Sequence, residues 1–244
     1  MLALIRLGGS NKKSSRQQPM FKPSVSGTWS GPLASELFGD AGSRRLKAGD
    51  TLFHEGDTGD GCYRLDKGLL KVRLTSLKGE ERIIAIIRSG AIVGDLALID
   101  GLPRAASIVA VTDCELRFGS KVAFQHFARK HPEIYEHLAR MLASRLRDAD
   151  AIIAFFAFLP MKARVARVLL DLAEDLGEET NSGGILIRRI NQSDQAAMAG
   201  VARENTNRIL SEGKRSGLVT KSSDSYWIAD KARLEGEISG SGLL

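Results

Sequence analysis

The apolar positions divide the chain into two parts with different periods. Between positions 50 and 120, short apolar runs are separated by glycines that recur every eleven or twelve residues, at Gly56, Gly68, Gly79, Gly90 and Gly101. Strand cores are expected in four of these runs, at 52–53, 62–65, 69–74 and 83–87. Strand-length runs joined by glycine turns are typical of an antiparallel β-roll or barrel, which we expect for residues 31–130.

After position 131 the apolar residues recur at steps of three and four, which indicates a helix. The stripe consists of Ile134, Leu138, Met141 or Leu142, Leu146, Ala149, Ile153 and Phe156. It predicts one amphipathic helix over 132–158, which Pro160 ends, leaving 158–162 as a hinge. A helix that packs only on its own roll would show the same stripe. A homodimer seam is favoured because the segment 151–158 is too apolar on all sides to face water.

A motif with the character of an anion site lies at 93–107. It combines an opening glycine, Gly94, with one acid, Asp95, and one arginine, Arg104, in an otherwise apolar run. Backbone N–H groups after Gly94 can form a phosphate-binding nest, and Arg104 can donate two parallel hydrogen bonds to phosphate oxygens. Asp95 would repel a phosphate, so its natural partner is a sugar hydroxyl. Phosphate and ribose together indicate a nucleotide, and a buried structural Arg–Asp pair without a ligand is the alternative.

A second motif, at 191–210, predicts two helices joined by a tight turn. Asn191 suits a helix N-cap, with Asp194 three residues later, and Gly200 permits the turn before the second helix. The second helix of such a helix-turn-helix enters the DNA major groove, where its polar side chains contact base edges. The expected DNA contacts are Gln192, Arg203, Glu204, Asn205, Arg208, Lys214 and Arg215, with Lys214, Arg215 and Lys221 near phosphates. A solvated helix face is the alternative. Residues 219–221 and 226–229 have the pattern of a β-wing hairpin.

Both motifs resemble those of one protein family. The segment from Gly94 to Ser107 is similar to the phosphate-binding cassette of cyclic-nucleotide-binding domains, and the Arg-Glu-x-x-x-Arg array that starts at Arg203 resembles the recognition helix of CRP/FNR transcription regulators. The resemblance covers about residues 33 to 236. It implies that Arg104 holds the cyclic phosphate and Asp95 the ribose 2′-hydroxyl, and that Arg203, Glu204 and Arg208 contact a G·C-containing half-site. The other cassette residues expected around the ligand are Gly94, Leu96, Ala97 and Ala105.

The resemblance also implies an α+β fold in three parts. These are an N-terminal cyclic-nucleotide-binding β-roll (31–130), a long dimerisation helix (131–159) and a C-terminal winged helix-turn-helix (160–236). The implied function is a homodimeric transcription regulator that binds palindromic double-stranded DNA in response to cyclic AMP or cyclic GMP, with no other cofactor required and RNA polymerase as a further partner. A regulator of the same family that needs no ligand, or that responds to a different signal, is the alternative.

Some positions depart from the family pattern. The long-helix residues that contact adenine in the family carry hydroxyl groups, whereas here they are Ala149 and Asp150. The Asp150 carboxylate only accepts hydrogen bonds and so suits the two donors of guanine; a solvated or salt-bridged Asp150 is the alternative. Ala105 lacks the hydroxyl that cyclic-GMP-selective members often carry, which favours cyclic AMP. We therefore expect both nucleotides to bind, with cyclic AMP as the leading ligand. Gly213 stands in place of a large apolar residue and is expected to loosen the recognition helix or end it early.

Composition agrees with a DNA-binding globular protein. The 244 residues carry a net charge of +6 and a sequence pI of about 9.4, which suits a polyanionic partner and is also common among ordinary soluble proteins. Cys62 and Cys114 stand far apart, as reduced, packed thiols would. No apolar run is long enough to span a membrane, and no catalytic or metal-ligand spacing occurs. We therefore expect a cytoplasmic protein that is not an enzyme, with a disordered leader at 1–30 and a flexible tail at 237–244.

Overall fold

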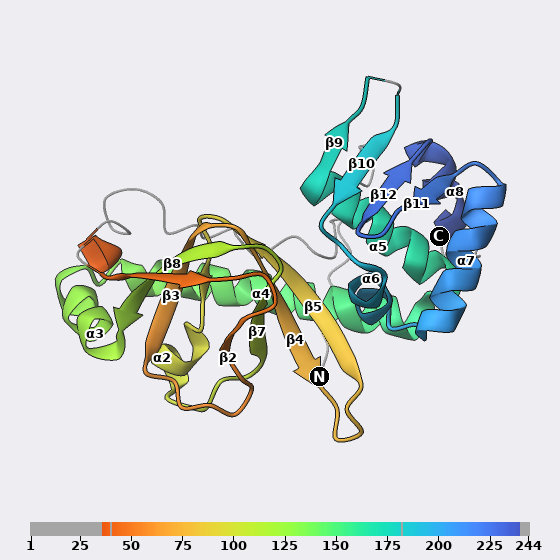
Figure 1. Cartoon of the computed structure of the whole chain (residues 1–244). Coiled ribbons are helices and arrows are strands. Elements are labelled where there is room, and N and C mark those ends of the chain that lie inside the picture. The colour runs from red at the N-terminus through yellow and green to blue at the C-terminus, as the bar shows by residue number, and fades with distance from the viewer. Residues whose placement is uncertain (1–35, 40, 182, 240–244) are drawn as a thin grey trace, which may run out of the picture.

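The computed structural model describes residues 36–39, 41–181 and 183–239. Figure 1 shows a β-rich domain beside a smaller domain of helices and strands, with the long helix α4 (Ile134–Phe158) running behind the first and reaching the second. The predicted α+β organisation is confirmed, while the predicted leader at 1–30 lies outside the described residues. Within the described ranges, no helix is both long and apolar enough to cross a bilayer.

The first domain is a roll of two antiparallel four-stranded sheets with the strand orders β1-β8-β3-β6 and β2-β7-β4-β5. The strands are β1 (Ser43–Leu46), β2 (Thr51–Phe53), β3 (Gly61–Lys67), β4 (Leu69–Thr75), β5 (Glu81–Arg88), β6 (Ile92–Val93), β7 (Ser107–Ala110) and β8 (Cys114–Ser120). All four predicted strand cores lie in strands. Leu65, Leu70 and Leu116 are fully buried between the sheets, and Cys62 and Cys114 are buried free thiols.

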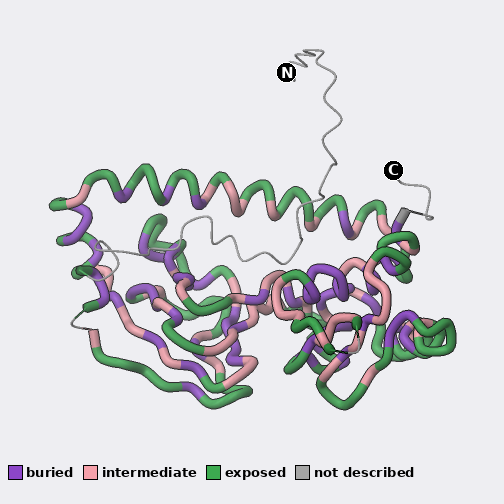
Figure 2. Tube along the Cα trace, turned by 90° about the horizontal axis from the view of Figure 1, so that it is seen from above, coloured by how far each residue is buried: buried purple, intermediate pink, exposed green. Residues whose placement is uncertain are grey.

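Helix α4 uses two faces for its apolar residues rather than the single stripe predicted. The residues buried against the roll and against α3 (Lys121–Lys130) are Ile134, Leu138 and Met141. Leu146 and Ile153 are not buried by these contacts, with exposed fractions of 65% and 66%. Figure 2 shows that much of the length of α4 is exposed. The prediction was wrong in assigning the buried residues and the exposed ones to a single stripe. A series of apolar residues at steps of three and four can be continued equally well from Met141 or from its neighbour Leu142, and the two choices lie on different faces of the helix. The buried face continues from Met141 to Arg145, which is polar and therefore hid the pattern.

The second domain contains the predicted helix-turn-helix and wing. Its elements are α5 (Met161–Leu176), β9 (Gly177–Glu179), β10 (Ile185–Arg188), α6 (Gln192–Ala199), α7 (Arg203–Arg215), β11 (Val219–Lys221), β12 (Ser225–Ile228) and α8 (Lys231–Ser239). Its strands form one antiparallel sheet in the order β11-β12-β10-β9. The break at Pro160 separates α4 from α5 as expected. The hairpin β9–β10 is an element that the sequence pattern did not reveal.

Two boundaries differ from the prediction. Helix α7 continues through Gly213 to Arg215, because a glycine costs a helix only about 1 kcal/mol and the buried Leu210 and Leu218 hold this part of the domain. Helix α8 runs to Ser239 and packs against α5, with Ile238 buried. Residues 237–239 therefore belong to the folded domain and not to the predicted tail.

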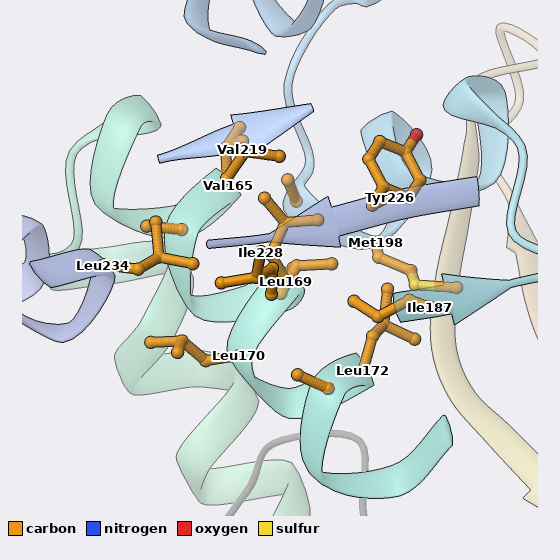
Figure 3. Packing of buried hydrophobic residues seen from close by; sticks show 14 of the residues in the cluster. Val165, Leu169, Leu170, Leu172, Ile187, Met198, Val219, Tyr226, Ile228 and Leu234 are labelled. Atoms are coloured by element: carbon orange, nitrogen blue, oxygen red, sulfur yellow. The ribbon is translucent and has the colours of Figure 1, made fainter. Parts of the chain in front are cut away.

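Helix α5 supplies the centre of the second domain's core. Figure 3 shows Leu169 and Leu172 of α5 packed with Ile187 and Ile228 of the sheet and with Met198 of α6. All five side chains are at most 1% exposed. The core fixes α6, and through it the position of α7.

The roll contacts the second domain directly through β4 and β5. The β5 residues Ile83 and Ile86 and the α4 residue Phe155 belong to the same buried cluster as the second domain's core. Lys71 of β4 places its Nζ 2.5 Å from a carboxylate oxygen of Asp194 in α6. Part of the apolar segment at 151–158 is therefore covered within the chain, by the second domain.

Candidate functional site

A cavity of about 290 Å³ lies between the roll and α4. The predicted cassette residues all line it: Gly94, Asp95, Leu96, Ala97, Arg104 and Ala105. The short helix α2 (Leu96–Asp100) follows directly after Gly94 and Asp95, so its backbone begins at the cavity wall. The residues that α4 contributes are Met141, Arg145, Asp148, Ala149 and Ile152.

Arg104 is held in the cavity wall by the roll. Its side chain is buried, Nη1 donates to the carbonyl oxygens of Gly61 at 2.8 Å and Gly94 at 2.7 Å, and Nη2 donates to Asp60 Oδ1 at 3.1 Å. The guanidinium carbon lies 4.3 Å from the centre of the Phe53 ring. Gly94 has φ +79°, and a Cβ at this position would collide with the guanidinium. A glycine is therefore required there by both conformation and space.

Asp95 is paired with an arginine that the sequence analysis did not place at the site. Its Oδ1 accepts from Arg145 Nη1 at 3.0 Å, which ties the cassette to α4. Arg145 follows Met141 by four residues, so the buried face of α4 was the signal that could have located it. Among the described residues, Asp95 Oδ2 and Arg104 Nε are buried without a hydrogen-bond partner. One acceptor and one donor thus remain free at the two groups predicted to hold the ligand.

Two other titratable groups beside the cavity have altered pKa values. Burial raises the pKa of the Cys62 thiol to about 12, and the charge of Asp95 adds to this rise while Arg104 opposes it. Burial also raises the pKa of the Asp148 carboxyl, and the neighbouring Arg147 and Arg145 only partly oppose that rise. Cys62 therefore stays protonated and neutral, whereas Asp148 is a partly desolvated acid in the lining.

The carboxylate that α4 brings to the cavity is that of Asp148, not Asp150. Asp150 is exposed and lies outside the lining. Two residues correspond to a rotation of about 200° around a helix, so the two carboxylates leave α4 on nearly opposite sides. The predicted projection of Asp150 toward the pocket of its own chain is therefore corrected.

The recognition helix α7 exposes most of its predicted DNA-contacting side chains. The exposed ones are Arg203, Glu204, Arg208, Lys214 and Arg215. Asn205 is half-buried, and its Oδ1 accepts from Arg208 Nη2 at 3.4 Å. Thr206 and Leu210 anchor the opposite face of α7 in the core. The predicted start of α6 is confirmed, because Asn191 Oδ1 accepts from the Asp194 backbone N at 2.9 Å.

Gln192 is engaged within the domain rather than on its surface. It is 6% exposed, its Nε2 donates to Asn207 Oδ1, and its Oε1 accepts from Lys221 Nζ at 2.7 Å. The side chain thus connects α6, α7 and the wing. Asn207, which is exposed and follows Arg203 by four residues, shares the exposed face of α7 and was not among the predicted contacts.

Comparisons with known proteins identify both domains. Residues 43–131 match the family model of the cyclic nucleotide-binding domain, and residues 163–237 match that of the Crp-like helix-turn-helix domain. The chain is 31% identical over 188 residues to a CRP-like cAMP-activated global transcriptional regulator of Mycobacterium tuberculosis, which covers 76% of this chain and 83% of that protein. The chain belongs to the CRP/FNR family of transcription regulators. As a member of the CRP/FNR family it is a DNA-binding regulator and not an enzyme.

Other members of the CRP/FNR family give the same result. The chain is 32% identical over 194 residues to a cyclic AMP receptor protein of Thermus thermophilus, covering 79% of this chain and 86% of that one. A solved structure of a CRP/FNR-family transcriptional regulator, also from Thermus thermophilus, superposes with a TM-score of 0.68 at 25% identity, covering 82% of this chain and all of the other. Membership of the CRP/FNR family confirms the fold and the DNA-binding function expected from the two motifs.

Proposed function

We propose that this regulator is a homodimer whose affinity for a palindromic DNA site is controlled by cyclic AMP or cyclic GMP bound in the cavity. The observation that carries the proposal is that Arg104, Asp95 and α4 line the same cavity. In addition, Arg104 Nε and Asp95 Oδ2 are buried there without a hydrogen-bond partner among the described residues. The cavity's volume of about 290 Å³ is close to the lower end of ligand pockets, roughly 300–1,000 Å³, which suits a mononucleotide. The two relatives described above, a cAMP-activated regulator and a cyclic AMP receptor protein, support the same ligand class.

The ligand would use the cassette as follows. Its cyclic phosphate would lie at the Arg104 guanidinium and the backbone after Gly94, where charge-assisted hydrogen bonds are strongest. The ribose hydroxyl would donate to Asp95, whose buried Oδ2 has capacity for it. Because Asp95 is tied to Arg145, occupation of the cassette changes the contacts of α4, and α4 leads to the second domain.

The DNA-binding half would use the exposed face of α7. Arg203, Glu204 and Arg208 would contact base edges in the major groove, and Lys214 and Arg215 would contact phosphates. A dimer would present two such helices to two half-sites. RNA polymerase is the further partner we propose for a regulator bound beside a promoter.

A calorimetric titration of the full chain with cyclic AMP and with cyclic GMP tests the proposal. Wild type is expected to bind at micromolar concentration. Arg104→Ala should abolish this binding, since loss of a buried charged partner costs about 3–5 kcal/mol. Arg45→Ala, at an exposed arginine of the same roll, is the control and should bind normally. Unchanged affinity in Arg104→Ala would contradict the assignment of the phosphate.

A second function is favoured by one observation. Arg104 donates to three oxygens of the chain and Asp95 has an ion-pair partner within it, so the cassette is held together by the chain itself. A regulator that needs no ligand, or that responds to another signal, would show this arrangement. Sequence-specific DNA binding combined with no heat of binding for either nucleotide at millimolar concentration would support this second function over the first.

A further inference from the structure

Helix α4 lines the cavity over three turns, from Met141 to Ile152. On this helix Arg145 is bonded to Asp95 of the cassette. Seven residues later, Ile152 lines the same cavity and also packs against the core of the second domain. The β4 and β5 side chains in the lining, which are Val72, Ile84, Ala85 and Ile87, are all aliphatic.

Asp148 lies between Arg145 and Ile152 on this helix and also lines the cavity. It follows Arg145 by three residues, which places it about 4.5 Å further along the helix axis and away from the cassette. A nucleotide with its phosphate and ribose at the cassette has its base beyond the ribose, in the part of the cavity that Asp148 and Ala149 line. Asp148 is thus the charged side chain that the described lining offers to a base.

Asp148 also lacks a partner of its own. The lining contains three other charged side chains, and each of them is already engaged: Arg104 with the roll, and Asp95 and Arg145 with each other. In the part of the chain that the structure describes, Asp148 has no hydrogen bond and no ion pair, and Arg145 and Arg147 act on it only through their charge from a longer distance. A half-buried carboxylate that accepts no hydrogen bond from the protein has lost part of its hydration. A ligand that donates hydrogen bonds to the carboxylate replaces the hydrogen bonds lost to water.

We propose that Asp148 contacts the base edge of the cyclic nucleotide and selects guanine over adenine, an inference that rests on the proposed function. Guanine presents two adjacent donors, N1–H and the 2-amino group, which match the two oxygens of one carboxylate. Adenine presents one amino group beside the N1 acceptor, and that acceptor repels a carboxylate. The chemistry of the lining therefore favours cyclic GMP, although the named relatives are cAMP-responsive.

The test compares three nucleotides and two neighbouring carboxylates by calorimetry of the full chain. Wild type should bind cyclic GMP roughly tenfold to a hundredfold more tightly than cyclic AMP, as expected for hydrogen bonds to a charged group. Asp148→Asn should remove most of this preference, because an amide has one acceptor and one donor group. Asp150→Asn is the matched control and should keep the wild-type ratio, because Asp150 lies outside the lining.

Cyclic inosine monophosphate adds a comparison that needs no variant. It keeps N1–H and lacks the 2-amino group, so wild type should bind it more weakly than cyclic GMP, and Asp148→Asn should bind the two equally. If Asp148→Asn does not fold, equal binding of these two ligands to wild type overturns the inference, and weaker binding of the inosine nucleotide supports it.

The outcomes separate this inference from the proposed function. If both nucleotides bind and Asp148→Asn leaves their ratio unchanged, or if Asp150→Asn changes it, the role of Asp148 is wrong and the proposed function stands. If neither nucleotide binds to wild type at millimolar concentration, both are wrong.

Discussion

At the scale of single residues, an exposed acid outside the cassette already occupies one donor of the arginine that is proposed to hold the phosphate. The Asp60 side chain is 68% exposed and holds Arg104 Nη2 at 3.1 Å, while the backbone carbonyls of Gly61 and Gly94 hold Nη1. The two carbonyls keep the guanidinium in position whether or not Asp60 is present. Asp60 therefore competes with the ligand for one donor rather than orienting the arginine.

Asp60→Ala is expected to strengthen nucleotide binding by about two- to fivefold, which is the size of an exposed ion pair. The measurement is the dissociation constant from calorimetry, with Glu80→Ala as a control at an exposed acid in the β4–β5 turn. Weaker binding of Asp60→Ala would mean that Asp60 positions Arg104 and that the carbonyls are insufficient.

Substitutions at the exposed residues of α7 should affect DNA binding differently according to the position of each residue on the helix. Arg203→Ala should cost about 1–3 kcal/mol of DNA binding and relax the preference at defined base pairs, because Arg203 lies in the first turn, where base edges are met. Lys214→Ala should weaken binding to all DNA sequences alike. It should also lower the slope of log binding constant against log salt concentration by about one, as expected when one phosphate contact is lost. The measurement is the affinity for a DNA site selected from random sequences and for a panel of variants of its half-site. Retained base preferences in Arg203→Ala would exclude direct contact with bases.

At the scale of elements, β4 and β5 form a wall shared by the cavity and the helix-turn-helix domain. Alternate side chains of a strand point to opposite faces. On β5, Ile86 is buried against the second domain while Ala85 and Ile87 line the cavity, and on β4 Lys71 faces α6 while Val72 lines the cavity. A ligand in the cavity and the DNA-binding domain therefore touch opposite faces of the same two strands.

Lys71→Met should loosen this contact and lower the free energy of unfolding by about 1–3 kcal/mol, because the Asp194 carboxylate loses its cation while remaining nearly buried. Thermal unfolding and limited proteolysis of the α4–α5 connection measure the effect. Lys67→Met, at an exposed lysine that ends β3, is the control. The double variant Lys71→Met/Asp194→Asn should cost less than the sum of the single changes. Additive costs would mean that the two side chains do not interact.

The same elements show what the sequence can and cannot predict. The strands, the cassette and the helix-turn-helix could be predicted because each is encoded by neighbouring residues. The run at 83–87 is apolar on both faces, which indicates burial on both sides but not the identity of the covering elements. Arg145 and Asp148 could not be placed because the apolar steps of α4 fit two rotations of the helix, and the choice depends on packing against a roll far away in sequence.

At the scale of the whole molecule, α4 presents an apolar seam that the other described residues leave exposed. Its members follow one another at alternating steps of four and three, the spacing of a coiled coil. They are Tyr135, Ala139, Leu142, Leu146, Ala149 and Ile153. The large residues of this seam are mostly exposed, and monomeric proteins rarely leave such a continuous stripe open. Ala149 also lines the cavity, so ligand and seam meet on one helix.

Ile153→Asp should dissociate the proposed homodimer, because a two-fold interface would place two carboxylates against each other in an apolar seam. Wild type should sediment at twice the chain mass of 26.4 kDa, and the variant at the mass of one chain. Leu77→Asp, at a fully exposed leucine in the β4–β5 turn, is the control and should remain dimeric. DNA affinity should fall together with dimerisation, since each half-site would then be bound singly. Sedimentation of wild type as a monomer, with and without nucleotide, would contradict the seam and leave the exposed face of α4 to a different partner.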